Sequence, residues 1–152
     1  MLEPTEVLAS ILHDPKDLDP VRSLVADDVT YVSLNYDNPD LHRIMPWAGT
    51  GRGPERIVQT FIGVERFWEK VDFQSKALFG SAEHAAMFGR FTYRSRVLGK
   101  LVTTPFAVFA KVVNGKCTYL QFMEDTFATS ASFRSGGQWK FRSDPDGGEV
   151  AV

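Results

Sequence analysis

Two adjacent carboxylates, Glu124 and Asp125, lie in a long apolar stretch that runs from Thr103 to Phe133. Burial in an apolar pocket raises the pKa of a carboxyl group, which suits it to take a proton from a carbon next to a carbonyl near neutral pH. Successive side chains of a strand point to opposite faces, so at most one of the two faces a pocket. The alternative is a structural acid that binds backbone amides or pairs with an arginine.

Tyrosine and asparagine side chains can supply the hydrogen bonds that such a reaction needs. Tyr31 and Tyr93 carry hydroxyls that can donate to a developing enolate oxygen. Tyr93 lies on the apolar side of its run, together with Phe91. Asn35 shares a face with Tyr31 and can orient a ligand. The alternative for both tyrosines is a place in the core with one satisfied hydroxyl.

Large aromatic side chains are numerous, with 12 phenylalanines and 3 tryptophans in 152 residues. They predict either a bulky core or a cavity with aromatic walls. The candidates for a pocket wall are Trp47, Phe61, Trp68 and Phe91. His42 lies in the longest irregular segment, residues 37–53, where it can act as a gate or an acid. Long ordered loops of this kind are often functional.

The elements that must position these residues follow from local signals. Asn114-Gly115 between two β-rich runs predicts a hairpin. Gly53-Pro54-Glu55 predicts the start of the best helix, with an apolar stripe at helical spacing. Two shorter helices are expected before residue 27, one capped by Thr5 and one starting at Asp19-Pro20, and a strand is expected over 29–36. Further strands are expected over 71–79, 84–97, 101–113 and 116–127.

This order predicts an α+β fold, with N-terminal helices packed on one face of a curved, antiparallel sheet. A single layer of helices leaves space on the concave side of a strongly bent sheet, and that space is the natural place for a ligand. We expect one domain over residues 1–135 and a polar, partly flexible tail over 136–152.

Composition excludes several classes of function. A net charge of −2 gives no reason to expect nucleic acid. No run is long and apolar enough to span a membrane, and the single Cys117 makes a reducing, cytoplasmic setting the default. No metal-ligand pattern is present, and Gly49-x-Gly51-x-Gly53 lacks the spacing of a phosphate loop. We therefore expect no metal and no cofactor.

The order of motifs resembles a known family. Residues 45–53 (MPWAGTGRG) opening a helix, and a meander closing on residues 114–116 (NGK) and 123–126 (MEDT), are similar to the SnoaL-like, ketosteroid isomerase-like branch of the nuclear transport factor two-like superfamily. The resemblance covers roughly residues 21–133. It implies a cone-shaped (cystatin-like) sheet with an internal pocket for a small hydrophobic molecule, often in a homodimer formed through the outer sheet face.

The same resemblance implies a site. Polyketide cyclases of this superfamily use an aspartate on the last strands as general acid/base, and Asp125 falls in the matching motif. The Asp-Arg-Asp triad of the epoxide hydrolases has no clear match, since Arg90, Arg94 and Arg96 fall on the outer face of their strand. Strand alternation from Asp125 places Met123 and Gln121 on its face, as ligand contacts.

Three functions remain open from the sequence. The chain is an isomerase or cyclase that uses Asp125 as base, with Tyr31 and Tyr93 as donors. Alternatively, it binds a hydrophobic ligand without turnover. In the third case its outer sheet face binds a partner chain.

Overall fold

A computed structural model describes residues 1–152. Its centre is a curved sheet of six strands in the order β2-β1-β6-β5-β4-β3, in which β1 is parallel to β6 and all other neighbours are antiparallel. The strands are β1 (Val25–Ser33), β2 (Gly49–Arg52), β3 (Trp68–Ser81), β4 (His84–Ser95), β5 (Leu101–Val113) and β6 (Lys116–Glu124). The helices are α1 (Pro4–His13), α2 (Leu18–Leu24), α3 (Pro39–Ile44), α4 (Pro54–Phe67) and α5 (Thr126–Ala131).

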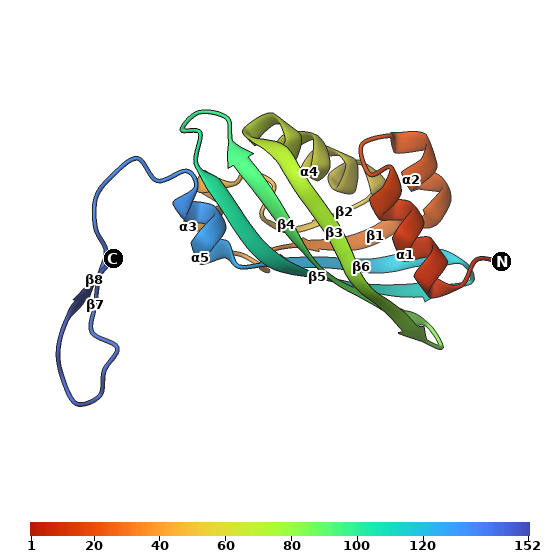
Figure 1. Ribbon diagram of the computed structural model, residues 1–152. Helices are drawn as coiled ribbons and strands as arrows, with labels where there is room; N and C mark the ends of the chain where they lie inside the picture. The colour runs from red at the N-terminus through yellow and green to blue at the C-terminus, as the bar shows by residue number, and fades with distance from the viewer.

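The helices α1, α2 and α4 pack on the same side of the sheet, which curves around them (Figure 1). This is the α+β architecture that the sequence predicts, a curved sheet that does not close. The long β5 shows how the sheet separates its two faces. Its residues alternate strictly, so that Val102, Phe106 and Val108 are buried against the helices while Leu101 and Phe109 are exposed. The core therefore lies between the concave face and the helical layer.

The hairpin between β5 and β6 forms at the predicted place. Val113 pairs with Lys116, so Asn114 and Gly115 are the two turn residues. Both have positive φ, 51° and 76°, as a type I′ turn requires. Such a turn matches the twist of the strands. The hairpin prediction is confirmed.

The best predicted helix also forms, as α4, directly after Gly53. Gly53 has φ 92° and ψ 156°, a conformation that L-residues rarely adopt. Pro54 occupies the first helical turn and Glu55 follows it, which matches the preference for proline at the first position and for an acid near the positive end of the dipole.

Three boundaries near the N-terminus differ from the prediction. A capping box between Glu3 and Glu6, rather than Thr5, begins α1. The helix α2 begins at Leu18, after Asp17, so Asp19 already lies in its first turn. The strand β1 begins at Val25, which pairs with Cys117, and not at residue 29. Its first part is irregular, with a register shift between Val25 and Thr30.

The segment 37–53 is more ordered than the sequence prediction of an irregular loop. Asn38 accepts hydrogen bonds from the backbone N–H of Asp40 and Leu41, at 3.1 Å each, and caps α3. Gly49–Arg52 then forms the edge strand β2 against β1. Asparagine, proline and glycine residues are typical of loops, but here Asn38 caps a helix and Gly49 begins a strand.

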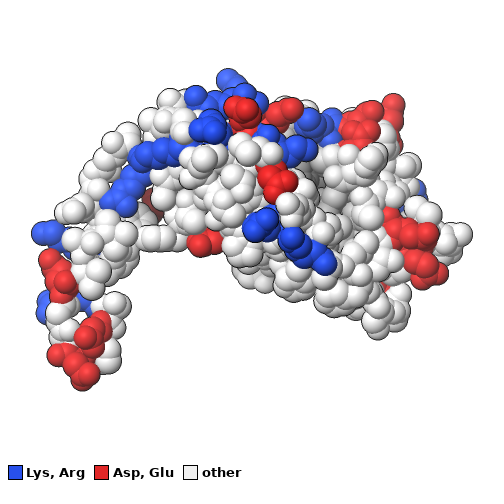
Figure 2. Space-filling model, viewed as in Figure 1, with Lys and Arg blue, Asp and Glu red and all other residues white.

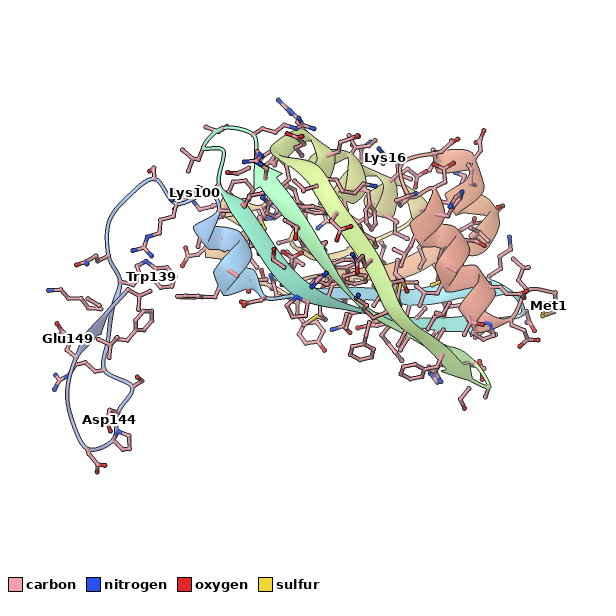
Figure 3. All side chains as sticks on the ribbon, viewed as in Figure 1. Met1, Lys16, Lys100, Trp139, Asp144 and Glu149 are labelled. Carbon is pink, nitrogen blue, oxygen red and sulfur yellow. The ribbon has the colours of Figure 1, made fainter.

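The chain leaves the sheet through α5 and ends in a small two-stranded unit, β7 (Lys140–Phe141) and β8 (Val150–Ala151). This unit stands away from the body of the molecule (Figure 1). Its far end carries acidic side chains (Figure 2), Asp144 lies toward that end, and Trp139 lies near its base (Figure 3). No helix is long and apolar enough to cross a membrane.

Candidate functional site

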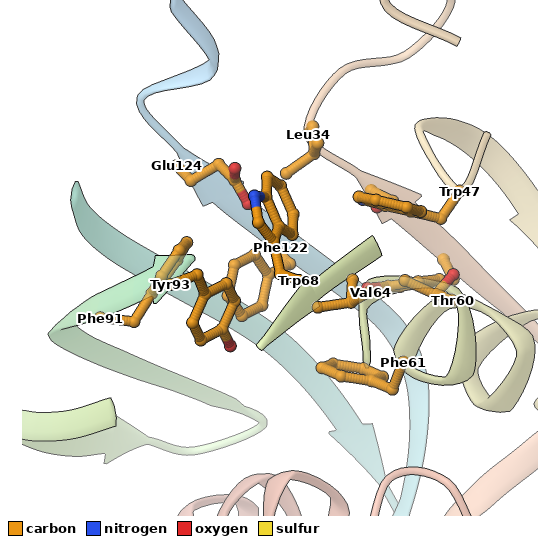
Figure 4. Close-up of a pocket in the computed structure, with 12 residues that line it drawn as sticks. Leu34, Trp47, Thr60, Phe61, Val64, Trp68, Phe91, Tyr93, Phe122 and Glu124 are labelled. Atoms are coloured by element: carbon orange, nitrogen blue, oxygen red, sulfur yellow. The ribbon is translucent and has the colours of Figure 1, made fainter. Parts of the chain in front are cut away.

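A small cavity lies between the concave face of the sheet and α4 (Figure 4). Its wall comes from β1, the 34–47 connection, α4, the start of β3, and the ends of β4 and β6, and 9 of its 12 lining residues are hydrophobic. The lining residues are Tyr31, Ser33, Leu34, Trp47, Thr60, Phe61, Val64, Trp68, Phe91, Tyr93, Phe122 and Glu124. Elements that are distant in the sequence therefore meet at one point.

Glu124 is the only ionisable carboxyl in this wall. It is the last residue of β6, and its Oε2 is buried without a hydrogen-bond partner. Burial raises the pKa of Glu124 to about 7, the nearby charge of Asp125 adds to this, and a hydrogen bond with Thr129 opposes it. A carboxyl with a pKa near neutrality can both accept and return a proton, the property that general acid/base catalysis needs.

Tyr31 and Tyr93 both line the same cavity, and both stay protonated at neutral pH. In Figure 4 the hydroxyl of Tyr93 points away from Glu124. Burial raises the pKa of Tyr31 and of Tyr93, and the charge of Glu124 raises both further. For Tyr31, interactions with the hydroxyls of Ser33 and Thr60 and the positive charge of Arg56 act in the opposite direction. Neutral tyrosines are hydrogen-bond donors, so the cavity combines one base with two donors.

The aromatic wall is held from behind by α5. Trp68 Nε1 donates to Ser132 Oγ at 3.0 Å, and its ring stacks on Phe133 with centroids 4.7 Å apart. Trp68 also contacts Trp47 at 5.3 Å and Tyr93 at 5.6 Å. The buried indole N–H is thus satisfied within the protein, which fixes the ring as a wall.

The cavity is narrow, and a wider groove adjoins it. About 20 Å³ of the cavity is open to the centre of a water-sized sphere, which is room for one or two waters. On the same measure the groove between the α1–α2 turn, α4 and β3 holds about 590 Å³. Phe61, Val64, Trp68 and Tyr93 line both spaces. These four side chains therefore form the boundary between the cavity and the groove.

Six of the residues selected from the sequence come together in this wall. They are Tyr31, Trp47, Phe61, Trp68, Phe91 and Tyr93. Strand alternation in β4 and helical spacing in α4 carried this information, because both patterns distinguish the covered face from the exposed one.

The structure places Asp125 outside the cavity, which corrects its expected position. Asp125 caps α5, and its Oδ1 accepts a hydrogen bond from the backbone N–H of Ala128 at 3.1 Å. Its own backbone N–H donates to Thr104 Oγ1 at 3.0 Å. The strand ends at Glu124, before the predicted end at residue 127, and the phase of its alternation is shifted by one residue, so the inward carboxyl is Glu124.

The same shift corrects Gln121 and Met123, which lie on the outer face. Gln121 Oε1 accepts from the Tyr119 hydroxyl at 2.8 Å, and its Nε2 lies 3.2 Å from the sulfur of Met123. Met123 is 39% exposed. Alternation counted from Asp125 assigned these residues to the wrong side, whereas the apolar Leu120 and Phe122 share the inner face with Glu124.

Two other selected residues lie outside the wall. His42 is exposed on α3, where its Nδ1 lies 3.0 Å from the carbonyl oxygen of Ala48. Asn35 follows β1, and both polar atoms of its side chain are buried without a partner. Sequence reasoning overlooked Ser33 and Thr60, although the alternation that pairs Tyr31 with Ser33 was a usable signal.

No family model matches the chain, but two curated proteins do. The chain is 41% identical to patulin synthesis protein F of Aspergillus clavatus over 155 aligned residues, which cover 98% of this chain and 78% of that protein. It is 40% identical to patulin biosynthesis cluster protein F of Penicillium expansum, over 95% of this chain and 76% of that protein.

Solved structures share the fold at low sequence identity. An NTF2-like (nuclear transport factor two-like) protein from Burkholderia thailandensis matches with a TM-score of 0.73 and 20% identity, over 88% of this chain and 99% of that one. TerC, co-crystallised with polyporic acid, matches with a TM-score of 0.70 and 18% identity, over 88% and 100%. A SnoaL-like polyketide cyclase from Mesorhizobium loti matches with a TM-score of 0.61 and 16% identity, over 80% and 98%.

These likenesses confirm the fold that the motifs at residues 45–53 and 114–126 indicate. The identity to the two curated proteins extends over nearly the whole chain. The chain therefore belongs to the family of patulin synthesis protein F and has the nuclear transport factor two-like, SnoaL-like fold.

Proposed function

We propose that this protein catalyses a proton transfer in the biosynthesis of a small secondary metabolite, with Glu124 as general acid/base. The observation that carries the proposal is the Oε2 of Glu124, buried and unpartnered in a cavity with aromatic walls. Buried polar atoms are nearly always satisfied, so an unsatisfied carboxylate oxygen is typical of a working site. The family relationship to patulin synthesis protein F supports the metabolic setting.

The reaction class follows from the groups in the wall. The ionised carboxylate of Glu124 takes a proton from a carbon next to a carbonyl. The electron pair of that C–H bond forms a C=C bond, and the π pair of the carbonyl moves to its oxygen. Tyr31 or Tyr93 donates a hydrogen bond to the resulting enolate oxygen. The protonated carboxyl then returns the proton at another atom, which completes an isomerisation or a ring closure without a cofactor or a metal.

The substrate class follows from the size and lining of the site. The wall is mostly hydrophobic and its free space is small, so we propose a small hydrophobic or aromatic molecule that bears a carbonyl. TerC, a structural neighbour, holds polyporic acid, which supports small-molecule binding in this fold. A larger substrate needs the boundary at Phe61 and Val64 to open toward the groove.

A second candidate function is ligand binding without turnover. The small free volume of the closed cavity favours it, because a tight apolar cavity suits retention as well as reaction. In that case the polar groups only orient the ligand. Replacing Trp47 or Phe61 should then weaken binding, and replacing Glu124 by glutamine should leave the biological output unchanged.

The experiment is complementation of an Aspergillus clavatus strain that lacks patulin synthesis protein F. Expression of the wild-type chain should restore patulin. Glu124→Gln should reduce the product to about 1% of that level or less, in line with the usual contribution of a general base. Asp125→Asn is the matched control and should retain full output, because asparagine caps a helix as well as aspartate does.

Two outcomes would contradict the proposal. Full patulin output from Glu124→Gln, with the variant folded and present at wild-type level, would remove the catalytic role of this carboxyl. Loss of patulin output from Asp125→Asn, with full output from Glu124→Gln, would show that Asp125 and not Glu124 is the general acid/base. If the wild-type chain failed to restore patulin, the proposal that it acts at the same metabolic step as patulin synthesis protein F would be wrong.

We also propose a homodimer formed through the outer sheet face, in a cytoplasmic setting. Phe79, Phe88 and Phe109 are 57%, 50% and 41% exposed there, and the rings of Phe79 and Phe88 stack with centroids 6.1 Å apart. Exposed aromatic clusters of this kind often mark protein interfaces. Sedimentation should give a dimer for the wild type and a monomer for Phe88→Arg; a wild-type monomer at high concentration would contradict it.

A further inference from the structure

Arg56, in the first turn of α4, lies across the edge strand β2 in a track made by two glycines. A Cβ atom added at Gly51 would fall 2.7 Å from Cγ, 2.9 Å from Cδ and 2.8 Å from Nε of Arg56. A Cβ added at Gly49 would fall 3.8 Å from Nη2. The stem of the arginine therefore occupies the space that a side chain at position 51 would need, and its guanidinium reaches Gly49.

The pairing of β1 with β2 shows which face of the sheet this is. Gly51 is opposite Tyr31 and Gly49 is opposite Ser33. Opposite residues of an antiparallel pair point to the same face, and Tyr31 and Ser33 line the cavity. Arg56 therefore lies on the concave face, beside the cavity wall formed by β1. Burial raises the pKa of the Tyr31 hydroxyl, and the positive charge of Arg56 offsets part of that rise.

The charge of Arg56 has no carboxylate partner. The ion pairs of the structure are Lys16–Glu65, at 2.9 Å, and Arg22–Glu55. Arg56 Nε is buried without a hydrogen-bond partner. Glu124 lies on the same face but two strands away, since β1 separates β2 from β6. Arg56 as a residue is half-buried, and its Nε lies in the buried part. A buried donor without a partner is costly, so an anion held by this guanidinium is the most direct explanation for its retention.

A second unsatisfied group lies at the same end of the sheet. The Cβ position at Gly49 is also 3.9 Å from the carbonyl oxygen of Tyr36, so the guanidinium and the turn that carries Asn35 both approach Gly49. Both polar atoms of the Asn35 side chain are buried and unpartnered. A guanidinium and a carboxamide, each with a free donor, can together bind an oxygen anion.

We infer that Arg56 makes the β1–β2 side of the site an anion subsite, which selects substrates bearing a carboxylate, enolate or phenolate oxygen. Asn35 and the hydroxyls of Tyr31 and Ser33 supply neutral donors to the same oxygen. The substrate class of the proposed reaction thereby narrows from a carbonyl compound to an acidic one. This inference rests on the proposed function for its biological meaning, although anion selection is measurable by binding alone.

The test compares benzoate with its neutral isostere benzamide by calorimetry at about pH 6, where Glu124 is mostly protonated. The wild type should bind benzoate at least about tenfold more tightly than benzamide, the factor that one charge-assisted pair supplies. Arg56→Met should bring the ratio to about one, and Arg56→Lys should restore part of it. Arg52→Met is the matched control, because Arg52 is an exposed arginine of β2, the strand that Arg56 crosses, and it is opposite Thr30.

Gly51→Ala gives an independent variant that keeps the charge and displaces it. Its methyl group should push the Arg56 stem out of the track and lower the benzoate preference, while Gly136→Ala, at a position with no atom within 4 Å, should not. Unfolding curves check that each variant is folded.

The inference fails if the wild type binds neither probe, if it shows no preference for benzoate, or if folded Arg56→Met retains the preference. Glu124→Gln separates this result from the proposed function. It should keep the benzoate preference even though it abolishes turnover, so loss of either property alone identifies which proposal is wrong.

Discussion

Glu124 and Asp125 are neighbours in the chain, and their carboxyl groups have opposite environments. Glu124 ends β6 and directs an unpartnered oxygen into the cavity, whereas Asp125 turns outward and caps α5. The cap also brings α5 into place, so that Thr129 contacts Glu124 and Ser132 holds Trp68. One carboxylate thus supports the position of the other.

The capping role of Asp125 predicts a loss of stability that is specific to its side chain. Asp125→Ala removes the acceptor for the Ala128 N–H and should lower the free energy of unfolding by about 1 kcal/mol. Asp125→Asn keeps an acceptor and should change it by less than about 0.5 kcal/mol. Urea unfolding measures both; equal loss in the two variants would show that the charge, and not the cap, matters.

The raised pKa of Glu124 predicts that stability falls as pH rises. The folded protein holds this proton up to about pH 7, whereas the unfolded chain releases it near 4.5. Between those values the folded state binds more protons, so the free energy of unfolding decreases with pH and then levels off. The difference should be roughly 3 kcal/mol. Glu124→Gln should remove this slope, and a wild-type curve without it would contradict the buried carboxyl.

At Gly89, near the centre of the sheet, the structure leaves no room for a side chain. A Cβ there would lie 2.1 Å from the backbone oxygen of Gln74 and 2.5 Å from the Phe106 ring. Gly89→Ala should therefore lower the free energy of unfolding by about 2 kcal/mol. Gly136→Ala is the control, since nothing lies within 4 Å of its Cβ position. Equal midpoints for the two variants in thermal unfolding would contradict the close packing.

The boundary between cavity and groove predicts a change in ligand size. Phe61→Ala should join the two spaces and let the protein bind 2-naphthol several-fold more tightly than the wild type, as measured by fluorescence. Gln121→Ala, on the outer face, should leave the affinity unchanged. An increase in both variants, or in neither, would show that Phe61 does not separate the two spaces.

Much of the fold could be predicted because its signals are local. Asn114-Gly115 needs only its own backbone preference to make a hairpin, and Gly53-Pro54 begins α4 by the same kind of chemistry. The start of β1 and the short strand β2 could not be predicted, because they depend on pairing with other strands. Gly49 and Gly51 are the best example, because the Arg56 side chain that crosses them explains why position 51 has no side chain, and that contact cannot be read from the sequence. The helix α3 was missed although its start signal, the Asn38 cap followed by Pro39, is local.

The walls of the site were predictable and its chemistry was not. Apolar spacing identified the inward face of β4 and α4, which placed Tyr93 and Phe61. The inward carboxyl depended on the phase of the alternation in β6, and the resemblance to the family motif, rather than the strand pattern itself, assigned the inward position to Asp125. A one-residue error moves every side chain of a strand to the other face, which is why Gln121 and Met123 were assigned with Asp125.

The most direct test is a pH titration of the Glu124 side-chain carbon by NMR, with Glu124→Gln used to assign its signal. The buried, unpartnered carboxyl should titrate with a pKa of about 7, and filling the cavity with a bound ligand should shift that value. A midpoint near the ordinary 4.5, or one that no ligand changes, would contradict Glu124 as the proton-transfer group of this site.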